Sequence, residues 1–281
     1  MIGVKQLFVY PVKSLRGFSV NSAKLLPQGL EHDRQWMIIN ESNGFVTQRK
    51  FSAMVLIHTQ IDNGQLILSK PSNPTLAPLI IKSKHSPKGD AFDARIWKDT
   101  CQVLDEGAAA SEWLGKALDY PTRLRLVRMA GIPRPQSKAE LLGADTHTYF
   151  ADAAPFLIAN TASLDAVNQQ LITAQFSAVP MERFRPNIVI DGIEAFAEHQ
   201  ITQLAHKDYQ LKHCYPCQRC IMPTVDIDSG VRHPQQQPFS LITAINAMPD
   251  NKKAPAFGEN AILVKGEGEI ITVGDLLDVR R

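Results

Sequence analysis

The amino-acid sequence predicts an α+β fold in which β structure predominates, with a β-barrel-like domain followed by a second β-rich domain. Short segments rich in Val, Ile, Leu and Phe recur along the chain, separated by Asn, Gly and Pro, which is the pattern of strands joined by turns. Helical patterns are few. The length of 281 residues corresponds to about two domains at roughly 150 residues each.

The first domain, residues 1–119, is expected to form a small barrel or sandwich. Its expected strands cover 2–9, 19–26, 35–40, 64–69 and 76–82, with a further strand from Phe45 and a hairpin over 95–104. A helix is expected over 107–118, where Ala, Trp and Leu residues gather before Asp119-Tyr120-Pro121 ends it.

The second domain, residues 120–281, is expected to begin with a strand over 122–128 and a mobile polar loop over 131–137. A helix is expected over 163–172 because Leu164, Val167 and Leu171 occupy positions i, i+3 and i+7. The remaining expected strands cover 187–191, 210–214, 261–265 and 270–273.

The charge balance limits what the protein binds. With 30 basic and 28 acidic residues the formal charge is +2 at pH 7, so no large field of one sign attracts a nucleic acid polymer or an anionic membrane. The N-terminal segment lacks the features of a signal peptide, and no apolar run approaches the ~20 residues of a membrane helix. A cytoplasmic protein that binds no membrane is therefore expected.

Three of the four cysteines, Cys214, Cys217 and Cys220, fall within seven residues, whereas Cys101 stands alone. This clustering in a chain of ordinary size does not indicate a disulfide framework. A zinc site would need a fourth ligand, and an iron–sulfur cluster would lack its fourth nearby cysteine. Three histidines could complete a zinc site: His206, His213 and His233.

A reactive thiolate is the other interpretation of this cluster. Arg219 beside Cys220, and the nearby His213, would favour the charged sulfur that attacks electrophiles or binds soft metals. The spacing alone leaves a zinc ligand, a nucleophile and a soft-metal ligand open.

The motif Arg219-Cys220-Ile221, followed by Thr224-Val225-Asp226 and Gly230, resembles the metal-ligand loop of MOSC domains, in particular those of the mitochondrial amidoxime-reducing component and bacterial YcbX proteins. Other segments resemble the same proteins in the same order: Tyr10-Pro11-Val12-Lys13-Ser14 with Gly29 and Asp33-Arg34-Gln35-Trp36, Glu182-Arg183-Phe184-Arg185-Pro186-Asn187-Ile188-Val189, and Phe257-Gly258. The earliest of these is similar to the β-barrel domain that precedes MOSC, so the resemblance spans essentially the whole chain.

The resemblance implies a molybdenum cofactor, a pyranopterin that chelates the metal through its dithiolene, with Cys220 as the catalytic cysteine and protein ligand to molybdenum. Cys217 has a counterpart in some relatives, and Cys214 is unmatched. The phosphate and pterin edges of the cofactor need cations, hydroxyls and amides. The residues expected to supply them are Lys13, Ser14, Arg34, Arg185, Asn187, Arg219 and Thr224. The cofactor would then lie between the domains.

Other candidates have a simpler alternative. Asn160, Thr161 and Ser163 precede or begin a helix, so they are either helix caps or phosphate donors at its positive end. Lys13 and Arg34, taken in isolation, would be solvated surface charges. Asp226 is counted with the cofactor-binding residues in a supporting role, in which it holds the turn of the cysteine loop.

The activity that the resemblance implies is the reduction of small-molecule N-hydroxylated compounds, with electrons from an external reductase or electron-transfer protein. A rival hypothesis is a carrier that holds the cofactor or a persulfide sulfur on Cys220. A zinc-stabilised interaction domain is the third.

Overall fold

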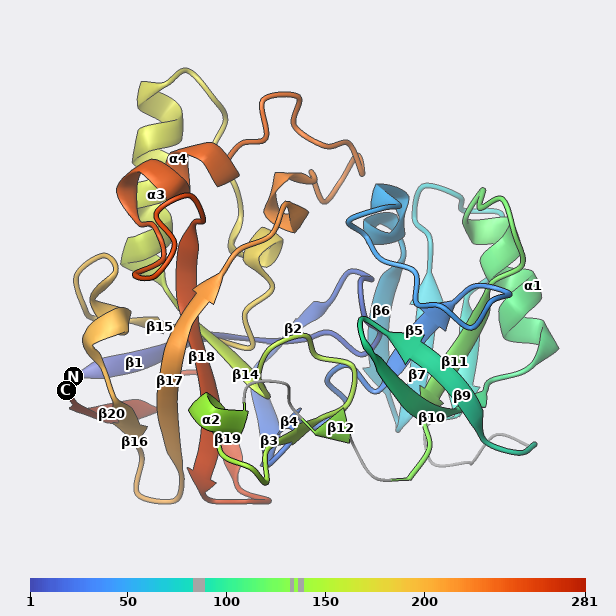
Figure 1. Cartoon of the computed structure of the whole chain (residues 1–281), viewed down its shortest axis with the longest axis horizontal. Helices are drawn as coiled ribbons and strands as arrows, with labels where there is room; N and C mark the ends of the chain where they lie inside the picture. Colours follow the sequence, from blue (N-terminus) through green and yellow to red (C-terminus); the bar gives the residue numbers. More distant parts are fainter. Residues whose placement is uncertain (83–88, 132–133, 136–138) are drawn as a thin grey trace.

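The structure is a computed structural model that describes residues 1–82, 89–131, 134–135 and 139–281. Figure 1 shows two β-rich bodies side by side, one carrying helices α3 (Thr161–Thr173) and α4 (Phe239–Ile245), the other carrying α1 (Ala108–Ala117). The expected fold class, α+β with β structure predominant, is confirmed. No helix in the described ranges has the length and apolar character needed to cross a membrane.

The larger body is a closed barrel. Its strands follow the order β15-β14-β18-β17-β16-β20-β1, and β15 pairs with β1 to close the ring. The strands are β1 (Ile2–Val9), β14 (Phe156–Asn160), β15 (Ile188–Asp191), β16 (Gln203–Ala205), β17 (Gln210–Gln218), β18 (Ala256–Lys265) and β20 (Leu276–Arg280). Strand β2 (Phe18–Val20) extends the sheet beyond β1, and buried aliphatic side chains fill the interior.

The smaller body combines two antiparallel sheets and α1 around a core that includes Trp36, Leu114 and Leu126, all fully buried. One sheet has the order β5-β11-β10-β9 and the other β6-β7-β8. Their strands are β5 (Trp36–Ile39), β6 (His58–Asp62), β7 (Gln65–Ser69), β8 (Leu79–Lys82), β9 (Phe92–Ile96), β10 (Asp99–Asp105) and β11 (Arg125–Met129).

Shorter elements complete the fold. Strands β3 (Ser22–Leu26), β4 (Gly29–Leu30) and β19 (Ile270–Thr272) form a small sheet, and β12 (Arg134–Pro135) pairs with β13 (His147–Thr148). The remaining helices are α2 (Ala139–Leu142) and the 3₁₀ turns η1 (Ser52–Leu56), η2 (Met181–Phe184), η3 (Ala197–Gln200) and η4 (Met222–Thr224).

Sheet pairing crosses the predicted domain boundary in both directions. Strand β1, from the start of the chain, completes the larger barrel, whereas β11, which follows residue 119, pairs with β5 and β10 of the smaller body. The division at residue 119 stays a prediction about the limits of the two domains. Between β1 and β2 of the larger body, Val12 bridges to Trp36 and Arg16 bridges to His58, so residues 10–16 also contact the smaller body.

Several expected elements differ in detail. The expected strand 19–26 is broken at Asn21 because β2 pairs with β1 while β3 pairs with β19, and Phe45 makes only isolated bridge contact with Ile39. Strand β17 continues past its expected end, and its register against β18 shifts on both sides of Pro216. In the loop expected to be mobile, residues 132–133 and 136–137 lie outside the described residues.

Candidate functional site

A cavity of about 440 Å³ opens between the two bodies. The smaller part of its wall comes from the N-terminal half, through Lys13, Ser14, Arg34, Arg49 and Trp97. The rest comes from three segments of the C-terminal half, at residues 150–157, 184–187 and 217–222, together with Asn260. The cavity therefore lies between chain segments that are far apart in sequence. That the cofactor lies there stays a prediction.

One wall is a stack of two guanidinium groups on one ring. Arg34 and Arg185 each lie 4.3 Å from the centroid of the buried Tyr10 ring. Arg34 donates to both carboxylate oxygens of Asp33, at 2.7 and 2.6 Å, and also to the Arg185 carbonyl at 3.2 Å. Arg185 donates to the Leu15 carbonyl at 2.6 Å. These contacts hold two cations in fixed orientations at the cavity wall.

Burial and a neighbouring cation both act on the charge of Arg185. Desolvation, followed by the neighbouring positive charge of Arg34, lowers the pKa of Arg185 from 12.5 to about 10. Arg185 therefore remains charged at neutral pH, in a place where an added anion would relieve the repulsion from Arg34.

The opposite wall contains a carboxylate that bridges the bodies. Asp152 accepts hydrogen bonds from Lys13 and from the Trp97 indole N–H, the latter at 2.9 Å, and Arg49 lies 3.5 Å away. Lys13 also donates to the Phe150 carbonyl at 2.7 Å. Burial alone would raise the pKa of Asp152, but Lys13, Trp97 and Arg49 outweigh it and lower the pKa to about 2.

This shift predicts an acid-sensitive contact between the two bodies. Because the folded-state pKa of Asp152 lies below its ordinary value of 3.8, its stabilising effect is complete above about pH 4 and is lost as pH falls toward 2. We expect Asp152→Asn to lower the free energy of unfolding at pH 7 and to flatten its decline between about pH 4 and 2. Urea denaturation at several pH values measures both; an unchanged pH profile would contradict the assignment.

Two of the three clustered cysteines line the cavity. Cys217, at the end of β17, and Cys220 both line it, whereas Cys214 does not, and burial raises the pKa of the Cys214 thiol. Arg219 donates to the Cys217 sulfur at 3.1 Å and to the Phe184 carbonyl at 2.7 Å. Among the clustered cysteines, Arg219 thus hydrogen-bonds Cys217, and Cys220 lines the cavity.

The zinc and iron–sulfur interpretations of the cysteine cluster both need several protein ligands close together. Within the described residues, no group of three or more His, Cys, Asp or Glu side chains is arranged to hold a metal ion. His213, one expected zinc partner, is buried and hydrogen-bonds the Glu198 carbonyl at 3.2 Å; burial lowers its pKa to about 4. A single cysteine ligand fits a metal that is bound mainly by a cofactor.

The donor set also fits an anionic cofactor. Among the described residues that line the cavity, five carry positive charge and one, Asp152, carries negative charge. The five are Lys13, Arg34, Arg49, Arg185 and Arg219. The Nε atoms of Arg49 and Arg219 are buried without a hydrogen-bond partner. A phosphate would satisfy such a wall, since buried cations require partners.

The structure separates the predicted site residues into two groups. Those that line the cavity are Lys13, Ser14, Arg34, Arg185, Asn187, Arg219 and Cys220. Those that lie outside its lining are Asn160, Thr161, Ser163, Thr224 and Asp226. The interpretation of Lys13 and Arg34 as solvated surface charges is wrong, because Lys13 is 5% exposed and the Arg34 side chain 13%.

The second group has structural partners instead. Asn160 caps α3 by accepting from the Ala162 N–H at 3.1 Å, and Ser163 donates to the buried Glu198 carboxylate at 2.7 Å. Thr161 is the first residue of α3, and Thr224 donates to the Ile221 carbonyl at 2.7 Å. Asn160, Ser163 and Thr224 therefore use their side chains within the protein, and none of the four residues lines the cavity. Their contact with the cofactor stays a prediction.

Sequence reasoning missed several wall residues, among them Arg49, Trp97 and Asp152. Trp97 could have been found, because a tryptophan followed by Lys98-Asp99 in a predicted hairpin stands beside a polar turn, and in the structure it is 48% exposed. Arg49 and Asp152 stand in polar loop segments that carry no local pattern.

Comparison with known proteins agrees with this architecture. The MOSC N-terminal beta barrel domain matches residues 1–121, and the MOSC domain matches residues 145–278. Fold and site thus define a two-domain MOSC protein, and the chain belongs to that family, together with proteins named mitochondrial amidoxime-reducing components.

Three such relatives show the extent of the similarity. The chain is 32% identical to mitochondrial amidoxime-reducing component 1 of Homo sapiens, over 92% of this chain and 78% of that protein. It is 30% identical to component 1 of Mus musculus, over 91% and 76% of the two chains. For component 2 of Bos taurus the identity is 29%, over 91% and 77%.

Proposed function

We propose that this protein is a molybdenum-cofactor-dependent oxidoreductase that reduces N-hydroxylated compounds, with Cys220 as the protein ligand to molybdenum. The observation that carries the proposal is the presence of Cys220 on the wall of a cavity whose charged residues are mostly cationic. The names of the relatives, which are amidoxime-reducing components, support the choice of reaction.

The residues that line the cavity would bind different parts of the cofactor. Arg34 and Arg185 would pair with the phosphate of the cofactor, because the Tyr10 ring already orients both guanidinium groups at the cavity wall. Ser14, also in the wall, would offer a hydroxyl to polar edges of the cofactor. The Asn187 amide accepts from the Leu157 N–H at 3.2 Å and donates to the Phe8 carbonyl at 3.4 Å, so only its second amide hydrogen would be left for the cofactor. When bound, the cofactor supplies the two-electron redox chemistry that removes the substrate oxygen as water.

Asp152 would orient the substrate rather than protonate it. With a pKa of about 2, its carboxyl group is ionised at neutral pH and has no proton to give. An ionised carboxylate would instead accept a hydrogen bond from an N–H group of an amidoxime-like substrate. Electrons would come from an external reductase or electron-transfer protein.

The test is turnover by cofactor-loaded protein. Incubation of the loaded protein with an amidoxime and a chemical reductant should produce the corresponding amidine, measured by mass spectrometry, with Cys101→Ser as a control because Cys101 lies away from the cavity. Fully loaded protein that fails to turn over, yet passes its cofactor to a molybdenum enzyme lacking it, would favour the carrier hypothesis.

A further inference from the structure

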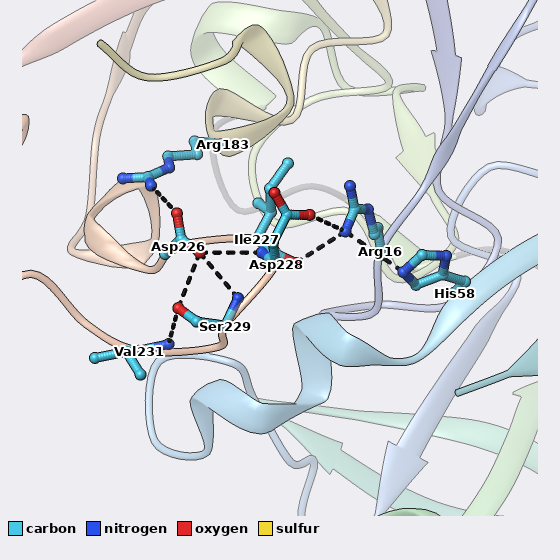
Figure 2. Close-up of polar contacts among 8 residues, drawn as sticks. All are labelled: Arg16, His58, Arg183, Asp226, Ile227, Asp228, Ser229 and Val231. Atoms are coloured by element: carbon cyan, nitrogen blue, oxygen red, sulfur yellow. Dashed lines mark hydrogen bonds and ion pairs between the residues drawn. The ribbon is translucent and has the colours of Figure 1, made fainter. Parts of the chain in front are cut away.

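The turn that follows the cysteine loop, residues 226–231, contacts both bodies of the protein at once (Figure 2). We propose that Asp226 is a positioning residue for Cys220: it folds this turn, ties it to Arg183 and thereby sets the cysteine loop against the cavity. The inference rests on the proposed function only in treating Cys220 as the reactive ligand.

Asp226 holds the turn together from within. Its Oδ1 accepts from the backbone N–H of Ser229 and from the Ser229 hydroxyl, both at 2.9 Å, and from the Asp228 N–H at 3.2 Å. Its backbone N–H donates to the Val231 carbonyl at 2.8 Å. A carboxylate that accepts several such bonds is strongly oriented, and these bonds help to lower the pKa of Asp226 although burial opposes them.

The other carboxylate oxygen, Oδ2, accepts from the Arg183 guanidinium, whose side chain is 10% exposed. Arg183 belongs to η2, which lies against η4, and η4 stands between Cys220 and Asp226 in the chain. Arg185, which lines the cavity, lies two residues after Arg183 in the chain. The ion pair therefore joins the loop that carries Cys220 to the segment that carries Arg185.

The same turn is anchored to the N-terminal half. Arg16 donates to the Ile227 carbonyl and to the Asp228 carboxylate, both at 2.9 Å, and contacts His58 at 3.4 Å. Ile227 packs with Val55 in a small apolar cluster. These contacts fix the direction in which the cysteine loop leaves the larger body.

The exposure of the carboxylates decides which contact matters most. The Asp228 side chain is 79% exposed, so its ion pair with Arg16 contributes little, as exposed ion pairs generally do. Asp226 is 41% exposed, but it combines three hydrogen bonds within the turn with a largely buried arginine. Asp228→Asn is therefore a matched control for Asp226→Asn in the same turn.

The experiment uses cofactor-free protein and measures the rate at which iodoacetamide alkylates Cys220, with Cys217 as the internal reference. We expect Asp226→Asn to raise the alkylation rate of Cys220 relative to Cys217 by about tenfold, since charged hydrogen bonds that restrain the loop are lost. We expect Asp228→Asn to change this ratio by less than about twofold. Hydrogen exchange should increase over residues 219–231 in the first variant alone.

Equal alkylation ratios in the wild-type protein and Asp226→Asn would overturn the proposal, as would an equal rise in both variants. Should Asp226→Asn fail to fold, Arg183→Gln removes the other end of the same ion pair and gives the same expected increase. Because no cofactor or substrate enters the measurement, a negative result here is distinct from failure of the proposed reductase activity.

Discussion

Replacing Cys220 with alanine is expected to abolish molybdenum retention while leaving the fold intact. The thiolate would be the protein's only sulfur bond to the metal, and no residue of different chemistry replaces a soft ligand to a thiophilic centre. The packing cost is small, because Cys220 is only partly buried and lies in a loop after β17. Protein produced in a host that makes the cofactor should contain about one molybdenum per chain, and the variant less than about one tenth of that.

The two neighbouring cysteines are the controls. Cys214→Ala should retain the metal, because Cys214 lies outside the cavity wall. Cys217→Ala should retain most of it, since Cys217 accepts a hydrogen bond from Arg219 but is not the expected ligand. Metal analysis together with fluorescence of the oxidised pterin measures both. Equal loss in all three variants would revive a shared cysteine cluster, and retention by Cys220→Ala would remove it from the mechanism.

Local patterns predicted most elements but not which body each would join. The alternation in 2–9 and 122–128 correctly indicates strands, and β1 and β11 lie there. Their partners, β15 and β5, are distant in sequence, and a strand pattern shows which face is buried without showing what covers it. Strand β17 also extends beyond its predicted end at residue 214. Proline disfavours a strand interior, but the pairing of β17 with β18 shifts in register on both sides of Pro216, so the strand continues through it.

The sequence likewise identified only part of the candidate site. Residues inside recognisable motifs, such as Lys13, Arg185 and Cys220, were identified before the fold was known, and all three line the cavity. For Asn160 the sequence left two interpretations open, a helix cap and a phosphate donor, and in the structure its side chain makes the cap contact. Asp152 belongs to the site only through its contacts with Lys13, Trp97 and Arg49, all far away in sequence.

Replacing Arg185 with glutamine is expected to weaken the retention of the cofactor strongly. Arg185→Gln removes a cation that faces the cavity and is already fixed on Tyr10, so a bound phosphate would lose a charge-assisted hydrogen bond worth about 1.5–3 kcal/mol. Cofactor retention should fall roughly 10- to 100-fold. Arg185→Lys should recover only part of it, because an ammonium keeps the charge but not the planar stacking on the ring.

Arg125→Gln is the matched control for this loss. Arg125 also stacks on a ring, with its guanidinium 4.6 Å from the Phe92 centroid, and pairs with Asp105 at 3.5 Å, but it is not part of the cavity wall. Pterin retained after gel filtration measures cofactor binding, and urea denaturation of both variants without cofactor separates binding from stability. Since the pKa of Arg185 is about 10, retention by the wild-type protein should also decline as pH rises through that value. Similar retention in both variants would show that the anion is held elsewhere in the cavity.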